Sequence, residues 1–184
     1  MSLNVGGDKL DYPGITATDT VSLFTLKLLL NSVISTSLSI FLTLDIKIYY
    51  NNTPMSRYEY MHILFSLITD EIVAQYNLRQ LSKEGWVYME IQKGMPRLKQ
   101  AGRIPDERIT KHIQKHGYAP CPHTPALWRH NTLPVVFTIV VADFGVKYTG
   151  KHNTKDLINA LRALYTITVD HTGSLYCGLT LAWD

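Results

Sequence analysis

Cysteine is scarce in this sequence, since only Cys121 and Cys177 occur among its 184 residues. Two cysteines cannot form the dense framework of a disulfide-stapled fold, so we expect free thiols in a reducing, intracellular compartment. Glycine and proline, at 11 and 8 residues, are too few for a collagen or a low-complexity chain. No heptad repeat is present either, which excludes a coiled coil.

The sequence also lacks a strong excess of charge of one sign. Eighteen Lys and Arg residues face fifteen Asp and Glu residues, which leaves a formal net charge of +3. Such a small excess permits nucleic-acid binding but does not argue for it. The apolar share of 46% is ordinary for a globular protein. The length indicates one domain, or one domain and a fragment.

Signals for secretion or membrane insertion are weak. No apolar segment follows a basic start at the N-terminus, so we expect no signal peptide. The most apolar stretch, residues 21–46, is long enough to span a bilayer. However, it contains Lys27, Asn31 and Asp45 together with many serines and threonines. A helix followed by a buried strand fits it better, and we expect no membrane partner.

Periodicity and turn residues predict a mixed succession of elements. The helix that begins near Asp19 or Thr20 has apolar residues at helical spacing, and the segment 135–141 is a β-branched run typical of a buried strand. Helices are expected over 19–34, 70–76, 106–116 and 156–164, and strands over 41–46, 86–91, 135–141, 146–148, 165–169 and 174–183. This order predicts an α+β fold whose mainly antiparallel sheet is covered by helices on one face.

An aspartate lies at the end of the first predicted strand. Asp45 closes an apolar run, and a carboxylate there can hold a divalent metal because hard cations prefer oxygen ligands. Tyr50, five residues further on, can wall a neighbouring pocket. A strand-ending aspartate beside core tyrosines explains the same residues without any site.

A basic segment follows the strand 86–91. Residues 93–103 carry four cations and two glycines, a composition that can cradle phosphates. The segment lacks the Walker spacing of a nucleotide-binding loop, so an ATP site is not indicated. A solvated basic turn before a helix is the alternative.

A second aspartate follows the β-branched run 135–141. Asp143 lies at the predicted hairpin tip Ala142–Gly145, where an acid is costly unless it is exposed or holds a metal. The sequence Asp-Phe-Gly also occurs in protein kinases, but no other kinase element is present.

Histidines offer a different metal site. They could form a zinc site with one cysteine, but no Cys-x2-Cys pair exists and prolines separate the candidates. The candidate zinc ligands are His112, His116, Cys121, His123 and His130. We expect the histidines to be surface or partly packed side chains instead.

In chain order, the three segments around Asp45, residues 93–103 and Asp143 resemble motifs A, B and C of a reverse transcriptase palm of the LTR-retrotransposon type. The similarity extends from Val5 to Asp184. Its most specific parts are DIKIYYNNTPMSRYEYM and DFGVKY, and the form LKQAG is similar to copia-like elements.

This resemblance implies RNA-directed DNA polymerisation by a nucleotidyltransferase that uses two Mg²⁺ ions, a nucleic-acid template-primer and dNTPs. Asp45 and Asp143 would be catalytic metal ligands, the backbone of Ile46 would add a carbonyl ligand, and Tyr50 would gate against a ribose 2′-OH. The nucleotide would also be flanked by Gln100, Ala101 and Gly102, and the primer end held by Leu175, Tyr176, Cys177 and Gly178. Residues 1–40 would be partial fingers with the first palm helix, and residues 41–184 the palm.

Departures from the family pattern lead us to expect an inactive fragment of a decayed transposable element. The first acid of motif C is replaced by Ala142, and the usual glycine of motif B by Arg97. Neighbouring residues of an extended chain point to opposite sides, so Asp143 is expected to be a poor substitute. Nothing in the sequence resembles the thumb or RNase H of the polyprotein. A non-catalytic nucleic-acid- or protein-binding remnant is the alternative function.

Overall fold

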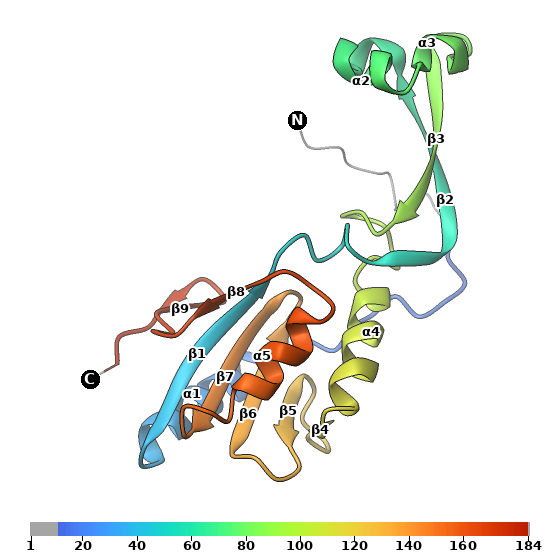
Figure 1. The fold of residues 1–184 in the computed structure, drawn as a ribbon. Helices are drawn as coiled ribbons and strands as arrows, with labels where there is room; N and C mark the ends of the chain where they lie inside the picture. Colours follow the sequence, from blue (N-terminus) through green and yellow to red (C-terminus); the bar gives the residue numbers. More distant parts are fainter. Residues whose placement is uncertain (1–10, 184) are drawn as a thin grey trace.

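A computed structural model describes residues 11–183 of the chain. The first part of the resemblance, from Val5 to residue 10, and the final Asp184 lie outside these described residues. The chain forms a mixed α+β structure, as the sequence predicts, with a six-stranded sheet, a smaller β-arm and five α-helices (Figure 1).

All neighbouring strands of the main sheet run antiparallel, in the order β4-β5-β6-β7-β1-β8. The long apolar strands β6, β7 and β1 occupy the centre, where both faces are shielded. The bounds are β1 (Ser39–Ile46), β4 (Tyr118–Pro120), β5 (Leu127–His130), β6 (Val135–Val140), β7 (Asp143–Thr149) and β8 (Ile167–Asp170).

One face of the sheet carries the main hydrophobic core. Helices α4 (Arg103–Gln114) and α5 (Lys155–Arg162) pack there. On this face β1 contributes alternate residues, Leu42, Leu44 and Ile46, which are almost completely buried. The period of two along the strand therefore directs one continuous apolar row toward the two helices.

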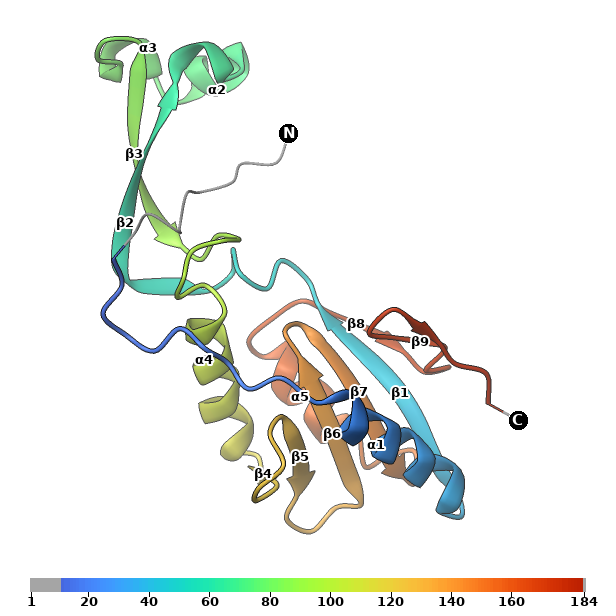
Figure 2. The same cartoon turned by 180° about the vertical axis from the view of Figure 1, so that it is seen from behind.

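The opposite face is covered as well, which corrects the expectation of helices on one face alone. Helix α1 (Leu23–Ser35) lies there with the small hairpin of β9 (Leu175–Tyr176) and β10 (Leu179–Thr180), as Figure 2 shows for α1. The physical reason is Phe41, which points away from the main core and is buried against α1 and Tyr176.

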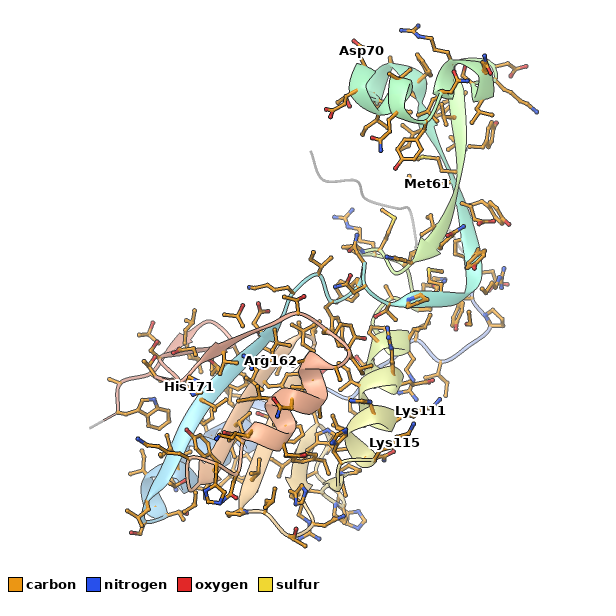
Figure 3. The ribbon with its side chains drawn as sticks, viewed as in Figure 1. Met61, Asp70, Lys111, Lys115, Arg162 and His171 are labelled. Atoms are coloured by element: carbon orange, nitrogen blue, oxygen red, sulfur yellow. The ribbon has the colours of Figure 1, made fainter. Side chains whose placement is uncertain are left out.

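A two-stranded arm projects from this body (Figure 1). It consists of β2 (Pro54–Leu64) and β3 (Trp86–Lys93), and its far end carries η2 (Phe65–Leu67), α2 (Asp70–Gln75) and α3 (Leu78–Leu81). Figure 3 places Asp70 at this far end. A small separate core of Val73, Leu78 and Val87 holds the tip together.

Two predicted elements differ in detail. The N-cap of α1 is Ser22, whose hydroxyl accepts a hydrogen bond from the Thr25 N–H at 3.0 Å, rather than Asp19 or Thr20. The single strand expected over 174–183 is instead the β9–β10 hairpin, because Cys177 and Gly178 both have positive φ and form its two-residue turn. Within residues 11–183, no helix combines the length and apolarity needed to cross a membrane.

Candidate carboxylate site

Asp45 and Asp143 are cross-strand partners in the register of β1 and β7. Directly opposed residues of antiparallel strands have Cα atoms about 4.5–5.5 Å apart and present their side chains on the same face. The two carboxylates therefore lie side by side near the end of the sheet, on the face that carries α1 and β9. Two residues that the resemblance assigns to one metal site are thus neighbours in the sheet.

The turn between β6 and β7 decides which acid faces Asp45. Val140 pairs with Asp143, so the turn consists of Val141 and Ala142, and Val141 adopts the left-handed φ of +57° that the turn requires. The expectation of Asp143 within the turn is thus wrong by one residue, since Asp143 already belongs to β7.

Ala142 has the opposite orientation. Its methyl group packs against the main core, and its carbonyl accepts a hydrogen bond from the Ile46 N–H at 3.1 Å. Neighbouring residues do point to opposite sides, but it is Asp143, and not Ala142, whose side chain lies on the same face of the sheet as Asp45. The expectation that Asp143 is the poorly placed acid is therefore corrected.

The pair has a shared electrostatic environment. Partial burial raises the pKa of the Asp143 carboxyl, and the negative charge of Asp45 raises it further. The positive charge of Lys47 lowers the pKa of Asp143, and the Lys47 ammonium group forms an ion pair with Asp45 Oδ2. Two carboxylates and one ammonium group therefore share one end of the sheet.

A cavity of about 330 Å³ opens in front of the two carboxylates. All four expected primer-end residues line it, so the structure brings that segment beside Asp45 and Asp143. The segment is held in place by Tyr176, whose hydroxyl hydrogen-bonds Thr138 Oγ1 at 2.9 Å. The primer-end residues are Leu175, Tyr176, Cys177 and Gly178.

Asp170 also lines this cavity and was missed by the sequence analysis. It lies on β8 opposite Thr43, but its carboxylate is occupied by the N–H and hydroxyl groups of Thr172 and Ser174. These hydrogen bonds lower its pKa to about 2. The signal in the sequence was an aspartate followed at two and four residues by hydroxyl side chains, a pattern typical of an Asx turn.

The expected nucleotide-binding residues do not line the carboxylate cavity. Tyr50 and Gly102 line a separate small cavity of about 60 Å³, which Val141 of the β6–β7 turn also borders. Gln100 is buried, and its amide donates a hydrogen bond to Glu59 Oε1 at 3.0 Å. Ala101 is buried in a small core at the base of the arm.

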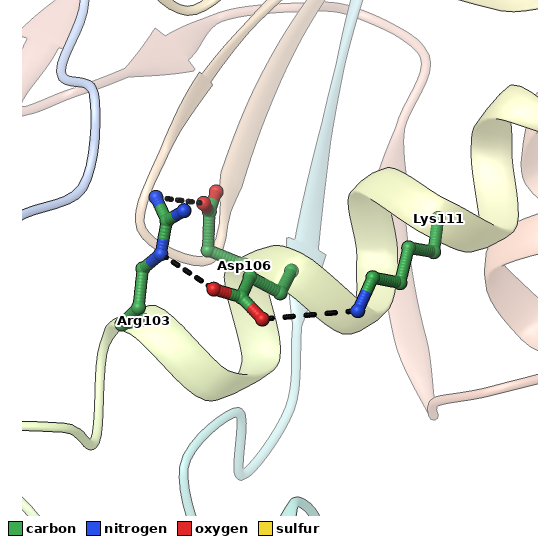
Figure 4. A network of polar contacts seen from close by, with 4 residues as sticks. Arg103, Asp106 and Lys111 are labelled. Carbon is green, nitrogen blue, oxygen red and sulfur yellow. Dashed lines mark hydrogen bonds and ion pairs between the residues drawn. The ribbon is translucent and has the colours of Figure 1, made fainter. Parts of the chain in front are cut away.

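Ion pairs neutralise part of the basic segment before α4. Arg103 Nε bonds Glu107 at 2.8 Å and its Nη1 lies 3.9 Å from Asp106, while Lys111 lies 3.8 Å from Glu107 (Figure 4). Arg103 is therefore engaged along its own helix, while Arg97 remains exposed.

The histidines of the alternative zinc site have other partners. His112 Nε2 lies 2.9 Å from the Ala160 carbonyl, and His130 Nε2 lies 3.0 Å from the His116 carbonyl. Across residues 11–183, no group of three or more His, Cys, Asp or Glu side chains is arranged to hold a metal ion.

The Asp45–Asp143 pair nevertheless has the chemistry that suits Mg²⁺. This ion keeps several water ligands and commonly binds through one or two carboxylates together with substrate phosphates. Both carboxylates are partly exposed and border the same cavity. A hard cation bridging protein and an anionic substrate therefore fits the donor set.

Comparisons with protein-family models, with curated proteins and with solved structures find no match for this chain.

Proposed function

We propose that this chain is the palm of a reverse transcriptase from an LTR-retrotransposon polyprotein, and that Asp45 and Asp143 bind a divalent cation. The observation that carries the proposal is the cross-strand pairing of these two acids, which come from segments 98 residues apart in the sequence. The resemblance assigns both to metal binding, and their side-by-side position supports that role.

Mg²⁺ would be held by the Asp45 and Asp143 carboxylates, and in this family such ions activate a primer 3′-OH and neutralise a triphosphate. Residues of the chain would position the primer end and the nucleotide. The β9–β10 hairpin borders the carboxylates and would hold the primer end there. Tyr50 and Gly102, across the β6–β7 turn, would contact the nucleotide.

Ala142 limits the activity that this site can support. It stands where the family pattern has the first of two adjacent acids, so Asp45 and Asp143 would have to bind the ions with one carboxylate fewer. If the missing ligand is worth several kcal/mol of transition-state stabilisation, the rate falls by roughly 10²–10⁴. We therefore propose a chain that binds the cation and nucleic acid but extends a primer slowly or not measurably. The same observation favours the second candidate function, a non-catalytic nucleic-acid-binding remnant.

The first test measures Mn²⁺ binding to the purified chain by electron paramagnetic resonance. We expect Asp45→Asn and Asp143→Asn each to weaken binding at least tenfold, a loss of about 1.4 kcal/mol. Asp70→Asn, at the far end of the arm, is the matched control and should bind like wild type. Equal binding by Asp45→Asn and wild type would refute the proposed metal site.

The second test separates the two candidate functions. A primer annealed to an RNA template is incubated with the chain, dNTPs and Mn²⁺, and binding of the same duplex is measured at several salt concentrations. Extension that Asp143→Asn abolishes supports the polymerase. Salt-dependent binding without extension supports the remnant. Absence of both would contradict a nucleic-acid role.

A further inference from the structure

Lys47 lies two residues after Asp45, and its ammonium group forms an ion pair with Asp45 Oδ2. The same positive charge opposes the rise in the pKa of Asp143. Asp143 is the cross-strand neighbour of Asp45, so this ammonium group lies beside the carboxylate pair. Lys47 is not among the site residues that the resemblance implies.

The backbone at Lys47 is fixed from several directions. Its N–H donates to the Thr166 carbonyl at 2.9 Å, and its carbonyl accepts from Asn52 Nδ2 at 3.3 Å. The preceding Ile46 N–H is bonded to Ala142. The main chain is thus held in place while the long side chain, about half exposed, keeps its freedom to move.

The charged side chains that line the cavity are all acidic. Among the described residues that line it are three carboxylates, Asp45, Asp143 and Asp170, and no Lys or Arg. Hydrogen bonds from Thr172 and Ser174 already satisfy the Asp170 carboxylate. The two cross-strand acids repel each other, and Lys47 provides the compensating positive charge.

We propose that Lys47 is the built-in counter-cation of the Asp45–Asp143 pair, and that a divalent cation displaces its ammonium group on binding. This inference rests on the proposed function, because it requires the pair to be a cation site. The ammonium group and the incoming ion compete for the same Asp45 oxygen. Lys47 therefore sets the cation concentration at which the site fills.

The experiment compares Mn²⁺ affinity among four forms of the full chain by isothermal titration calorimetry. Lys47→Met keeps an unbranched side chain without the charge, and we expect about tenfold tighter binding, equivalent to about 1.4 kcal/mol. Lys47→Arg keeps the charge and should bind within about threefold of wild type, about 0.7 kcal/mol. Lys151→Met removes an exposed lysine from the loop after β7, at the other end of the sheet, and should bind like wild type.

Thermal melting supplies an independent readout. Without metal, Lys47→Met should melt at a lower temperature than Lys151→Met, because it leaves two neighbouring carboxylates uncompensated. Mn²⁺ should raise the melting temperature of Lys47→Met more than that of wild type. Asp45→Asn in the Lys47→Met background should recover part of the loss.

Two results would overturn the inference in different ways. Unchanged or weaker Mn²⁺ binding by a folded Lys47→Met variant would refute the displacement of Lys47 while leaving the metal site intact. Mn²⁺ binding by no form of the chain would refute the proposed metal site, and the displacement with it. If no form binds Mn²⁺, the melting temperatures still test the counter-cation role. That role would also be refuted if Lys47→Met melts at a lower temperature than wild type and adding Asp45→Asn does not raise its melting temperature.

Discussion

Asp143 faces Asp45 because of its register in β7, and a shift of one residue would exchange it with Ala142. Side chains alternate along a strand, so such a shift would turn the carboxylate toward the main core and the methyl group toward the cavity. Several neighbouring pairs fix the register, including Leu44 with Phe144 and Leu42 with Val146. These four side chains are almost completely buried, and a slip of β7 would turn Phe144 and Val146 away from the main core.

Gly145, two residues after Asp143, has a packing role. A Cβ atom there would lie 2.6 Å from Tyr176 Cε1 and 2.9 Å from Phe41 Cζ, closer than real contacts allow. We predict that Gly145→Ala destabilises the chain by about 1–3 kcal/mol, since a buried aromatic ring must move. Urea unfolding measures the change. Gly102→Ala, whose Cβ would meet only Thr18 at 3.9 Å, is the control, and equal losses in both variants would contradict the account.

Arg97 occupies a backbone conformation that suits glycine. Its φ is +74°, in the left-handed region where a Cβ atom is disfavoured. A non-glycine residue in the left-handed region costs about 1–2 kcal/mol of stability. A glycine there avoids this strain, but its greater conformational freedom in the unfolded chain offsets part of the benefit. We predict that Arg97→Gly stabilises the chain by about 0.5–1 kcal/mol in urea unfolding. The control is Lys99→Gly, at an exposed neighbouring residue without positive φ, which should destabilise the chain. If both variants are less stable than wild type, Arg97 is not strained.

At the scale of elements, the turn from β8 to β9 positions the hairpin beside the carboxylates. Asp170 ends β8, and its carboxylate accepts hydrogen bonds from the N–H groups of Thr172 and Ser174 at 2.8 and 3.2 Å. Gly173 completes the turn with a φ of +57° and lies against Phe41. This one turn therefore decides where Tyr176 meets the sheet.

We predict that Asp170→Asn destabilises the chain by about 1 kcal/mol at neutral pH, because an amide can accept fewer of these hydrogen bonds. The folded-state pKa of Asp170 lies near 2, below the ordinary value of 3.8. A depressed pKa stabilises the fold above the unfolded value, and that contribution is lost as the pH falls toward the folded value. The difference in melting temperature between variant and wild type should therefore shrink from pH 4 to pH 2. A constant difference would indicate that the carboxylate charge is not involved.

At the scale of the whole molecule, α1 has apolar residues on both of its sides. Its inner side packs on the sheet through residues such as Leu29, while Phe24 and Leu28 on the outer side are 71% and 52% exposed. Lys27 is the only charged residue in the helix. An uncovered apolar helix face of this kind promotes association.

We predict that the purified chain self-associates through this face. Replacing Phe24 and Leu28 together with Gln should lower the weight-average sedimentation coefficient at high protein concentration, because it removes exposed apolar area without breaking the helix. Tyr60→Gln, on the exposed face of the arm, is the matched control and should leave association unchanged. A wild-type chain that sediments as a monomer over the whole concentration range would refute the prediction.

The sequence by itself determined the class of structure and most of its elements. Apolar periodicity located α1, β1, β6 and α5, because these segments are long and strongly patterned. It also identified Asp45 and Asp143 as candidate ligands, since each follows an apolar run. Local chemistry was enough for these conclusions.

Only the tertiary structure decided which residues meet. The register between β1 and β7 pairs Asp143 with Asp45, and the Asp170 turn brought the β9–β10 hairpin to the same cavity. The buried apolar side chain of Phe41, on the face opposite the main core, required the second face of the sheet to be covered. β1 and β7 are far apart in the sequence, so the pattern of either segment by itself does not show which of its residues will face the other strand.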